Sequence, residues 1–302
     1  MLANFEQLQK LVDPALRRHV VVAAANDAHS LGAVMQAAAA GIFDYTLVAE
    51  PQKAEQAASQ CGQKLDPQKL LPAYSEEEAA AIAVAQIRAG KGNVLMKGLL
   101  HSNVFLRAVL NRQSGIRGPG LLCHAALLDT PAYPKLLCVI DGGMVPYPQL
   151  AEKAEILHHA ATLFHSLGYT RPKAAVLAAA ETISPEIRES IDAQKLKEMD
   201  FPDLEVDGPL SLDLAISPEA CQVKGYQSCV AGNADILLVP NLAAGNLMGK
   251  AIVHFGHARM AGCVLGAQVP IVLTSRAAQS EEKYFSLLLA AILCQHEMRL
   301  KQ

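Results

Sequence analysis

Short apolar runs alternate with helical segments through the C-terminal third of the chain. Residues 236–239 are continuously apolar and are closed by a proline, which is typical of a strand buried on both faces. Apart from Leu242, residues 241–246 are small or polar and predict a loop, and apolar residues then return at helical spacing over 247–258. A second apolar run over 264–273 predicts another strand. The next residues, Thr274-Ser275-Arg276, therefore stand at a strand end, where open α/β sheets bind their ligands.

The same alternation extends back to the N-terminal part of the chain and defines the fold class. Ser75 with Glu78 predicts a helix start, Ser184-Pro185 predicts another, and residues 207–209 predict a turn. Strands alternating with helices indicate an α/β fold with a parallel sheet and right-handed crossovers. Asp141-Gly142-Gly143 is the expected crossing point between two lobes. The other predicted strands cover residues 19–25, 45–48, 93–96, 121–126, 136–140 and 174–179.

Composition excludes several classes of protein. The 302 residues are 51% hydrophobic and 18% charged, as expected for a compact enzyme with a large core. The net charge of −3, from 26 basic and 29 acidic residues, argues against a nucleic-acid-binding or membrane-binding surface. The seven cysteines are scattered without a CxxC pair, and no apolar stretch approaches the ~20 residues of a membrane helix. Because the start also lacks a secretory signal, we expect a cytoplasmic protein.

Ser275 and Arg276 are the first candidates for chemistry. A guanidinium group offers a planar fork of donors that matches a phosphate, and the neighbouring hydroxyl adds another polar group. The alternative is a surface salt bridge from Arg276 to Glu281 or Glu282. We expect Ser280 to cap the last helix, which puts Glu282 in its first turn, where the helix dipole alone favours an acidic residue.

Two glycines and a lysine in the predicted loop and helix suggest a phosphate loop. The segment from Gly245 to Lys250 superficially resembles a Walker A sequence, but it is one residue short between its glycines. It also lacks the Ser or Thr that would hold Mg²⁺, and we reject nucleotide hydrolysis. Gly245 and Gly249 then serve either tight packing or the close approach of a ligand.

The cysteines and histidines do not form a site. Cys123 and His124 are neighbours on a strand and point to opposite faces, so each cysteine is expected to be a small buried hydrophobe. His254 and His257 stand three apart on a predicted helix, yet no third ligand is evident nearby. No metal site is predicted.

Several blocks of residues, in one order, carry a resemblance to a known family. They are LMKGLLHSNVFLRAVLN (95–111), IDGGMVPYP (140–148), AAETISPEI (179–187), DGPLSLDLA (207–215), PNLAAGNLMGK (240–250) and LTSRAAQSEEK (273–283). Together they resemble the phosphate acetyl/butyryltransferase family, nearest to its butyryl branch. The resemblance implies a two-lobed α/β fold based on parallel sheets, similar to the isocitrate/isopropylmalate dehydrogenases, with the active site in the cleft between the lobes. The first lobe would comprise residues 1–140 and 265–302, and the second 141–264.

The resemblance also implies an activity. Members of the family move an acyl group between coenzyme A and inorganic phosphate through a ternary complex, without an acyl-enzyme and without a catalytic metal. The partners are then acyl-CoA and phosphate, with CoA as a substrate and no tightly bound cofactor. We also expect a homo-oligomer, at least a dimer. A phosphate acetyltransferase, or a non-catalytic sensor of CoA or acyl phosphate, is the alternative.

Five of the eight predicted site residues match functional positions that the resemblance implies, with Glu282 standing where the acetyl branch has an Asp. Ser275, Arg276 and Glu282 are the predicted catalytic residues, with Glu282 as the base for the CoA thiol. Ser102 and Arg107, five residues apart, are predicted to bind substrate from the first lobe. The other predicted substrate-binding residues are Lys97, Gly245 and Asn246.

Overall fold

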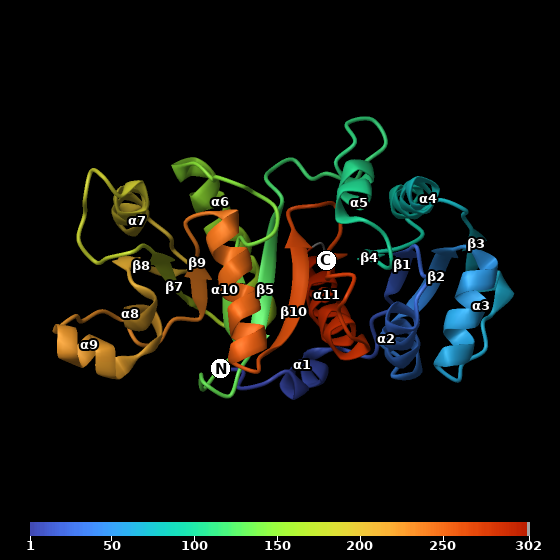
Figure 1. Ribbon diagram of the computed structural model, residues 1–302, viewed down its shortest axis with the longest axis horizontal. Coiled ribbons are helices and arrows are strands. Elements are labelled where there is room, and N and C mark those ends of the chain that lie inside the picture. Colours follow the sequence, from blue (N-terminus) through green and yellow to red (C-terminus); the bar gives the residue numbers. More distant parts are fainter. Residues whose placement is uncertain (301–302) are drawn as a thin grey trace. The chain divides into compact units, whose positions relative to one another are not determined.

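The computed structural model describes residues 1–300, and the chain divides into two compact units (Figure 1). The first unit comprises Leu8–Leu122 with the chain from Ala261 onward, and the second comprises Met1–Gln7 with Cys123–Met260. The sequence placed the divisions later, after residues 140 and 264. The structure draws the first division earlier because β6 (Leu137–Ile140) pairs with β9 (Ile236–Leu238) of the second unit and with its own neighbour β5 (Cys123–Asp129).

The first unit has a mostly parallel sheet, in the order β3-β2-β1-β4-β11-β10. Its strands are β1 (His19–Ala23), β2 (Asp44–Ala49), β3 (Leu70–Pro72), β4 (Val94–Lys97), β10 (Arg259–Leu265) and β11 (Ile271–Val272). Only β10 and β11 pair antiparallel within this set. The single strand predicted over 264–273 is therefore wrong: the chain turns back between β10 and β11, and Gly266 takes a φ of +87° in that turn.

Helices cover both faces of this sheet. The helices α2 (Ala28–Ala39) and α11 (Ser280–Leu300) pack together on one face, and α4 (Glu76–Arg88) with α5 (Ser102–Val109) covers the other (Figure 1). Every residue of α11 from Lys283 to Gln295 is buried. The predicted start of α4 is confirmed, since the Ser75 hydroxyl accepts a bond from the Glu78 amide at 3.1 Å. The remaining helices here are α1 (Glu6–Leu11), shared with the second unit, α3 (Pro51–Gln60) and the 3₁₀ turn η1 (Pro67–Lys69).

The strands of the second unit follow the order β5-β6-β9-β7-β8 and are of mixed direction. The strands β7 (Lys173–Leu177) and β8 (Glu205–Leu210) run parallel to β9, while β5 and β6 are antiparallel. The helices α6 (Leu150–Ser166) and α7 (Arg188–Glu198) pack on one face of this sheet, and α8 (Leu212–Ile216) with α10 (Leu242–Phe255) packs on the other. The short helix α9 (Pro218–Lys224) follows α8. The α/β fold with mostly parallel strands, as predicted, is confirmed.

Three local predictions in the second unit are wrong. Ser184 does not start a helix, because its amide donates to the Ser190 hydroxyl in a turn, and α7 begins only at Arg188. Residues 207–209 lie inside β8, an edge strand, where a proline is tolerated. Residues 242–246 are the first turn of α10, since the Asn241 side chain caps that helix by accepting from the Ala244 amide at 3.0 Å.

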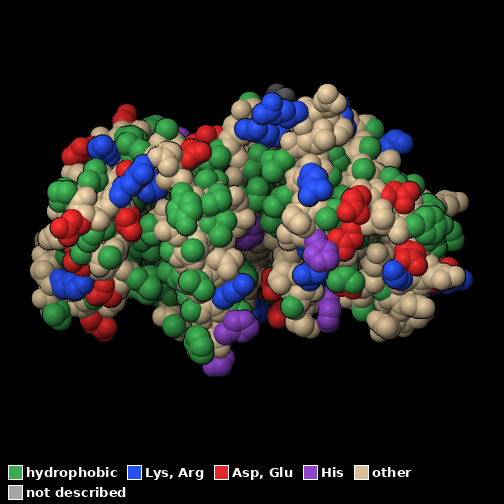
Figure 2. Space-filling view, turned by 45° about the horizontal axis from the view of Figure 1, so that its top comes forward, with side chains coloured by type: hydrophobic (Ala, Val, Ile, Leu, Met, Phe, Trp, Pro, Cys, Tyr) green, Lys and Arg blue, Asp and Glu red, His purple; other side chains and the backbone are tan. Residues whose placement is uncertain are grey.

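The charge distribution on the surface and the hydropathy of the helices agree with what the composition predicted. On the face seen in Figure 2, acidic and basic side chains are interspersed rather than separated into a basic face. Within residues 1–300, no helix is both long enough and apolar enough to cross a membrane.

Candidate functional site

The candidate site is built at the carboxyl ends of three neighbouring strands in the first unit. The strand β4 pairs in parallel with β1 on one side and with β11 on the other, so their carboxyl ends share one edge of the sheet. Lys97 is the last residue of β4, Asp27 follows β1, and Thr274-Ser275-Arg276 follows β11. Backbones are close here: a Cβ on Gly98 would lie 2.3 Å from the Ala24 carbonyl oxygen.

Two buried lysines hold the residue that precedes the Ser-Arg pair. Lys97 is 0% exposed and Lys283 is 1% exposed. The Lys97 ammonium group donates to the Thr274 carbonyl oxygen at 3.4 Å and to the Gly98 carbonyl oxygen at 3.3 Å. The Lys283 ammonium group donates to the Thr274 hydroxyl at 3.2 Å. Because these lysines come from β4 and from the first turn of α11, they fix the turn after β11 from two elements.

Burial of these two cations changes their titration. Desolvation lowers the pKa of Lys97 to about 8, and the charges of Lys283 and Arg276 act in the same direction. Desolvation also lowers the pKa of Lys283, while the charges of Asp27 and Glu282 oppose that change. One Asp27 carboxylate oxygen caps α2 by accepting from the Ser30 amide at 2.8 Å. The other is buried without a hydrogen-bond partner, which leaves its charge available to both lysines.

Arg276 is exposed and is oriented by a chain of hydrogen bonds. Its guanidinium group donates to Nε2 of His101 at 2.9 Å. Because a guanidinium only donates, Nε2 must accept, and the ring proton is on Nδ1. The Nδ1 group contacts both carboxylate oxygens of Glu76 at 2.9 Å, and the His101 amide donates to the same carboxylate at 2.8 Å. Burial acts to raise the pKa of Glu76, but these hydrogen bonds and the charge of Arg276 lower it overall.

Ser275 and Glu282 flank this arrangement. The exposed Ser275 hydroxyl accepts from the Ala277 amide at 3.3 Å. Glu282 is half-buried in the first turn of α11, and desolvation raises the pKa of its carboxyl group while Lys283 opposes the shift. The predicted cap is not at Ser280, which is already the first residue of the helix and lies 3.4 Å from Nδ1 of His29.

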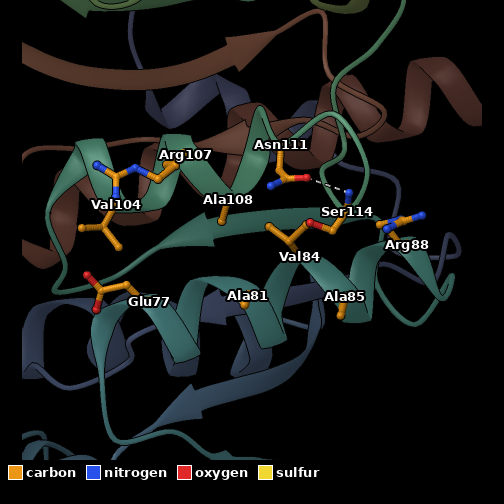
Figure 3. A pocket seen from close by; sticks show the side chains of 10 residues that line it. All are labelled: Glu77, Ala81, Val84, Ala85, Arg88, Val104, Arg107, Ala108, Asn111 and Ser114. Carbon is orange, nitrogen blue, oxygen red and sulfur yellow. Dashed lines mark hydrogen bonds between the residues drawn. The ribbon is translucent and has the colours of Figure 1, made fainter.

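The structure brings some predicted residues together and separates others. Ser102 directly follows His101 and so begins α5 beside the Arg276 partner. Arg107 lies in the last turn of α5 and lines a different pocket of about 260 Å³ between α4 and α5. Figure 3 shows Arg107 and Arg88 at opposite ends of that pocket, with small apolar side chains such as Val84 and Ala108 along it.

Gly245 and Asn246 lie on α10 in the second unit. A Cβ on Gly245 would come within 2.7 Å of the Val239 side chain and 2.8 Å of the Gly142 Cα atom, so this position requires glycine for packing. The Asn246 side chain donates to the Gly142 carbonyl oxygen at 3.3 Å. Of the two interpretations of Gly245, these distances support tight packing.

Cysteine and metal chemistry lack support in the described residues. Burial raises the pKa of Cys138 and of Cys263 to about 12, and it also raises the pKa of Cys221 and Cys229. Such thiols are poor nucleophiles. Across residues 1–300, no group of three His, Cys, Asp or Glu side chains is arranged to hold a metal ion.

Comparison with known proteins agrees with this geometry. The family model described as "Phosphate acetyl/butaryl transferase" matches residues 73–291, which include every strand end of the candidate site except that of β1. The chain belongs to the phosphate acetyl/butyryltransferase family. As a member of this family it is an acyltransferase that acts on phosphate.

Named relatives fall in both branches of the phosphate acetyl/butyryltransferase family. The phosphate butyryltransferase of Clostridium acetobutylicum is 35% identical over 297 residues, covering 97% of this chain and 99% of the relative. The phosphate acetyltransferase of Rhizobium meliloti is 37% identical over 276 residues, covering 90% and 87%. Sequence identity alone therefore does not separate the two branches.

Solved structures give the same fold. The crystal structure of a branched-chain phosphotransacylase from Enterococcus faecalis V583 matches with a TM-score of 0.81 at 30% identity, covering 92% of this chain and 99% of that one. A 4-hydroxythreonine-4-phosphate dehydrogenase from Burkholderia phymatum matches with a TM-score of 0.52 at 13% identity, covering 92% and 98%, which shows a shared fold only. The predicted dehydrogenase-like architecture is confirmed.

Sequence reasoning missed four residues that build the site. Lys283, Asp27, His101 and Glu76 were not predicted as site residues, although all four contact or electrostatically influence predicted ones. Lys283 had a local signal, because it is a charged residue at the start of a continuously apolar helix. Glu76 and His101 had none, since 25 positions separate them in the sequence.

Proposed function

We propose that the protein transfers a short-chain acyl group, butyryl in preference to acetyl, between coenzyme A and inorganic phosphate. The observation that carries this proposal is the Ser275-Arg276 turn, which two buried lysines hold at the carboxyl edge of the sheet. It lies within the segment matched by the family model. The preference for butyryl rests on the motif LTSRAAQSEEK.

The arrangement suits a direct transfer. A phosphate oxygen attacks the thioester carbonyl carbon and forms a tetrahedral oxyanion, and the carbon–sulfur bond then breaks to release CoA as a thiolate. Arg276 and Ser275 donate to the negative charge that develops on the transferring group. The phosphate gives up its proton to the Glu282 carboxylate, and Glu282 then passes that proton to the released thiolate; in the reverse direction the carboxylate removes the proton from the thiol.

The environment of Glu282 fits that role. A thiol of pKa ~8.5 and a carboxylate of pKa ~4.3 are poorly matched as acid and base. Desolvation raises the pKa of Glu282 and so brings it closer to the pKa of the CoA thiol. The same burial keeps a fraction of the group protonated at a higher pH than an exposed glutamate, which serves the step that protonates the thiolate.

The remaining parts of the proposal concern binding and context. CoA enters as a substrate, and we propose no tightly bound cofactor and no metal. Ser102, Arg107, Lys97, Gly245 and Asn246 are proposed to contribute to substrate binding directly or by shaping the site. We further propose a cytoplasmic homo-oligomer, at least a dimer.

A thiol-release assay tests the function. The purified protein is incubated with acetyl-, propionyl- or butyryl-CoA, with and without inorganic phosphate, and free CoA is measured. Phosphate-dependent release, fastest with butyryl-CoA, is expected, whereas fastest release with acetyl-CoA would place the protein in the acetyl branch. Release from none of the three, with CoA still bound, would leave a sensor in place of an enzyme. Arg276→Gln serves as the inactive control.

A further inference from the structure

A group of buried charges lies next to the Ser275-Arg276 turn, and the proposed transfer does not use it. Lys97, Lys283 and Asp27 form this lysine–aspartate cluster. Both lysines are buried, although a lysine is almost never fully buried unless it is paired. Among residues 1–300, no carboxylate oxygen lies at salt-bridge distance from either ammonium group. Their charge therefore has to be balanced from further away.

Both ammonium groups bind one neutral residue, Thr274. Lys97 donates to the Thr274 carbonyl oxygen at 3.4 Å, and Lys283 donates to the Thr274 hydroxyl at 3.2 Å. A charged donor gives a stronger hydrogen bond than a neutral one. The turn that carries Ser275 and Arg276 is thus held by two bonds whose strength depends on the lysines keeping their protons.

Asp27 is the acid that both lysines share. Its charge acts on Lys97 and on Lys283, in each case to favour the protonated form. One carboxylate oxygen caps α2 by accepting from the Ser30 amide at 2.8 Å, and an asparagine would cap the helix equally well. The other oxygen is buried and has no hydrogen-bond partner among residues 1–300. Because burying a charged oxygen without a partner costs free energy, the cap alone does not account for the carboxylate.

The backbone fixes Asp27 with respect to the two lysines. The two amides that follow Lys97 donate to the carbonyl oxygens of residues 23 and 24, each at 2.8 Å, just before Asp27. The helices α2 and α11 lie side by side (Figure 1), and a Cβ on Gly32 would lie 3.2 Å from the Ser280 hydroxyl oxygen. The strand end, the helix cap and the first turn of α11 are therefore packed as one piece.

Lys97 is the member of the cluster that changes charge near physiological pH. Desolvation lowers the pKa of Lys97 to about 8, and the charges of Lys283 and Arg276 act in the same direction. The acids that oppose this shift are Asp27 and Glu76. These four groups come from α11, the turn after β11, the turn after β1 and α4, which are the elements packed against β4. Without the charge of Asp27, Lys97 would lose its proton at a lower pH.

We propose that Asp27 is a positioning residue that acts through Lys97 and Lys283. Its negative charge keeps the two ammonium groups protonated, and they hold Thr274 and with it the Ser275-Arg276 turn. This inference rests on the proposed function, because it takes from it the role of Arg276 at the developing charge. Asp27 does not touch the reacting atoms. Its loss should therefore lower kcat and leave KM for both substrates unchanged.

The test compares the pH dependence of kcat in wild type and in Asp27→Asn. The substitution keeps the shape and the cap of α2 and removes only the charge. The loss of rate at alkaline pH should begin roughly one pH unit lower in the variant, the scale of one nearby opposite charge. The variant should therefore be close to wild type near pH ~6.5 and roughly tenfold slower near pH ~9. A purely structural defect would lower kcat by the same factor at both pH values.

NMR of protein labelled with ¹³C in its lysine side chains follows the charge of Lys97 without any substrate. The Lys97 signal, assigned by its absence in Lys97→Met, should titrate near pH 8 in wild type and at a lower pH in Asp27→Asn. Thermal melts are measured alongside and should differ little, since asparagine keeps the cap.

Asp66→Asn is the matched control. Asp66 belongs to the same unit and caps the 3₁₀ turn η1 by accepting from the Gln68 amide at 3.0 Å, but it is exposed. The same chemical change at this cap should leave the pH profile of kcat and the Lys97 titration unchanged.

Three results would overturn the inference. A kcat ratio that is the same at every pH would mean that Asp27 is only a helix cap. An unchanged Lys97 titration in Asp27→Asn would mean that the carboxylate does not act on the lysine. A raised KM with unchanged kcat would assign the cluster to substrate binding. The proposed function fails separately: a protein that shows the shifted Lys97 titration and releases no thiol keeps the charge coupling and loses the enzyme.

Discussion

Arg276→Gln is expected to lower kcat by roughly 10²-fold or more, the scale measured when one donor to a developing oxyanion is removed. The substitution keeps a polar side chain of similar length but removes the charge and the donor fork. The attacking phosphate carries about two negative charges near pH 7, and the thioester oxygen gains charge as the bond forms. A group that interacts more strongly as this charge develops lowers the barrier, whereas equal binding of both states would change only KM.

The structure predicts that folding will be nearly unaffected. Arg276 is exposed and its hydrogen bond to His101 is 2.9 Å long. One such bond contributes about 1 kcal/mol or less to the free energy of unfolding at an exposed site. A loss of that size still leaves almost all molecules folded, given a typical stability of about 5–15 kcal/mol. Misfolding therefore cannot account for a 10²-fold loss of rate.

Steady-state kinetics with butyryl-CoA and phosphate provide the measurement, with a thermal melt for each variant. Arg276→Lys should recover only part of the lost rate, because an ammonium group lacks the planar fork. His101→Ala keeps the guanidinium but removes its hydrogen-bond partner, and we expect a loss of less than tenfold. If Arg276→Gln instead raised KM for CoA and left kcat unchanged, the arginine would be a docking residue and the assigned catalytic role would be withdrawn.

Three further expectations follow from individual observations. Burial raises the pKa of Glu282 in the folded protein. Its contribution to the free energy of unfolding is therefore fully present below the ordinary glutamate pKa of ~4.3. That contribution is lost as the pH rises through the pKa that Glu282 has in the folded protein. The melting temperature of Glu282→Gln should therefore exceed that of wild type at pH 7 and equal it near pH 4. The variant should lose activity at both pH values. Equal melting temperatures at pH 7 would contradict the burial argument. Double-reciprocal plots at several phosphate concentrations should intersect, since burial raises the pKa of Cys138 and Cys263 and so disfavours a thiolate nucleophile there. Parallel lines would indicate an acyl-enzyme. In sedimentation experiments the protein should be at least a dimer. On α10, Leu247 is 69% exposed and Phe255 is 86% exposed, and such exposed apolar side chains are typical of an interface. Leu247→Asp should therefore shift the protein toward monomer, and an unchanged oligomer would place the interface elsewhere.

Much of the fold follows from local sequence. Continuous apolar runs predicted β1, β4 and β9 to within two residues at either end, because a strand covered on both faces requires apolar side chains on both. The errors fell where the local signal is shared by two structures. Small polar residues before α10 are typical of a loop, yet the Asn241 cap turns them into a helix start. Likewise, residues 207–209 have the composition of a turn and are held in an edge strand by pairing with β7.

The site divides in a similar way. The sequence by itself determined the candidates Ser275, Arg276 and Glu282, because their chemistry and their place after an apolar run are local properties. Only the tertiary structure decided what surrounds them. Parallel pairing of β4 with β11 brings Lys97 to Thr274 across 177 positions of the chain, and the packing of α4 beside α5 brings Glu76 to His101. Burial then shifts the pKa of Lys97 and of Glu282, and burial is a property of the packed units that no stretch of sequence contains.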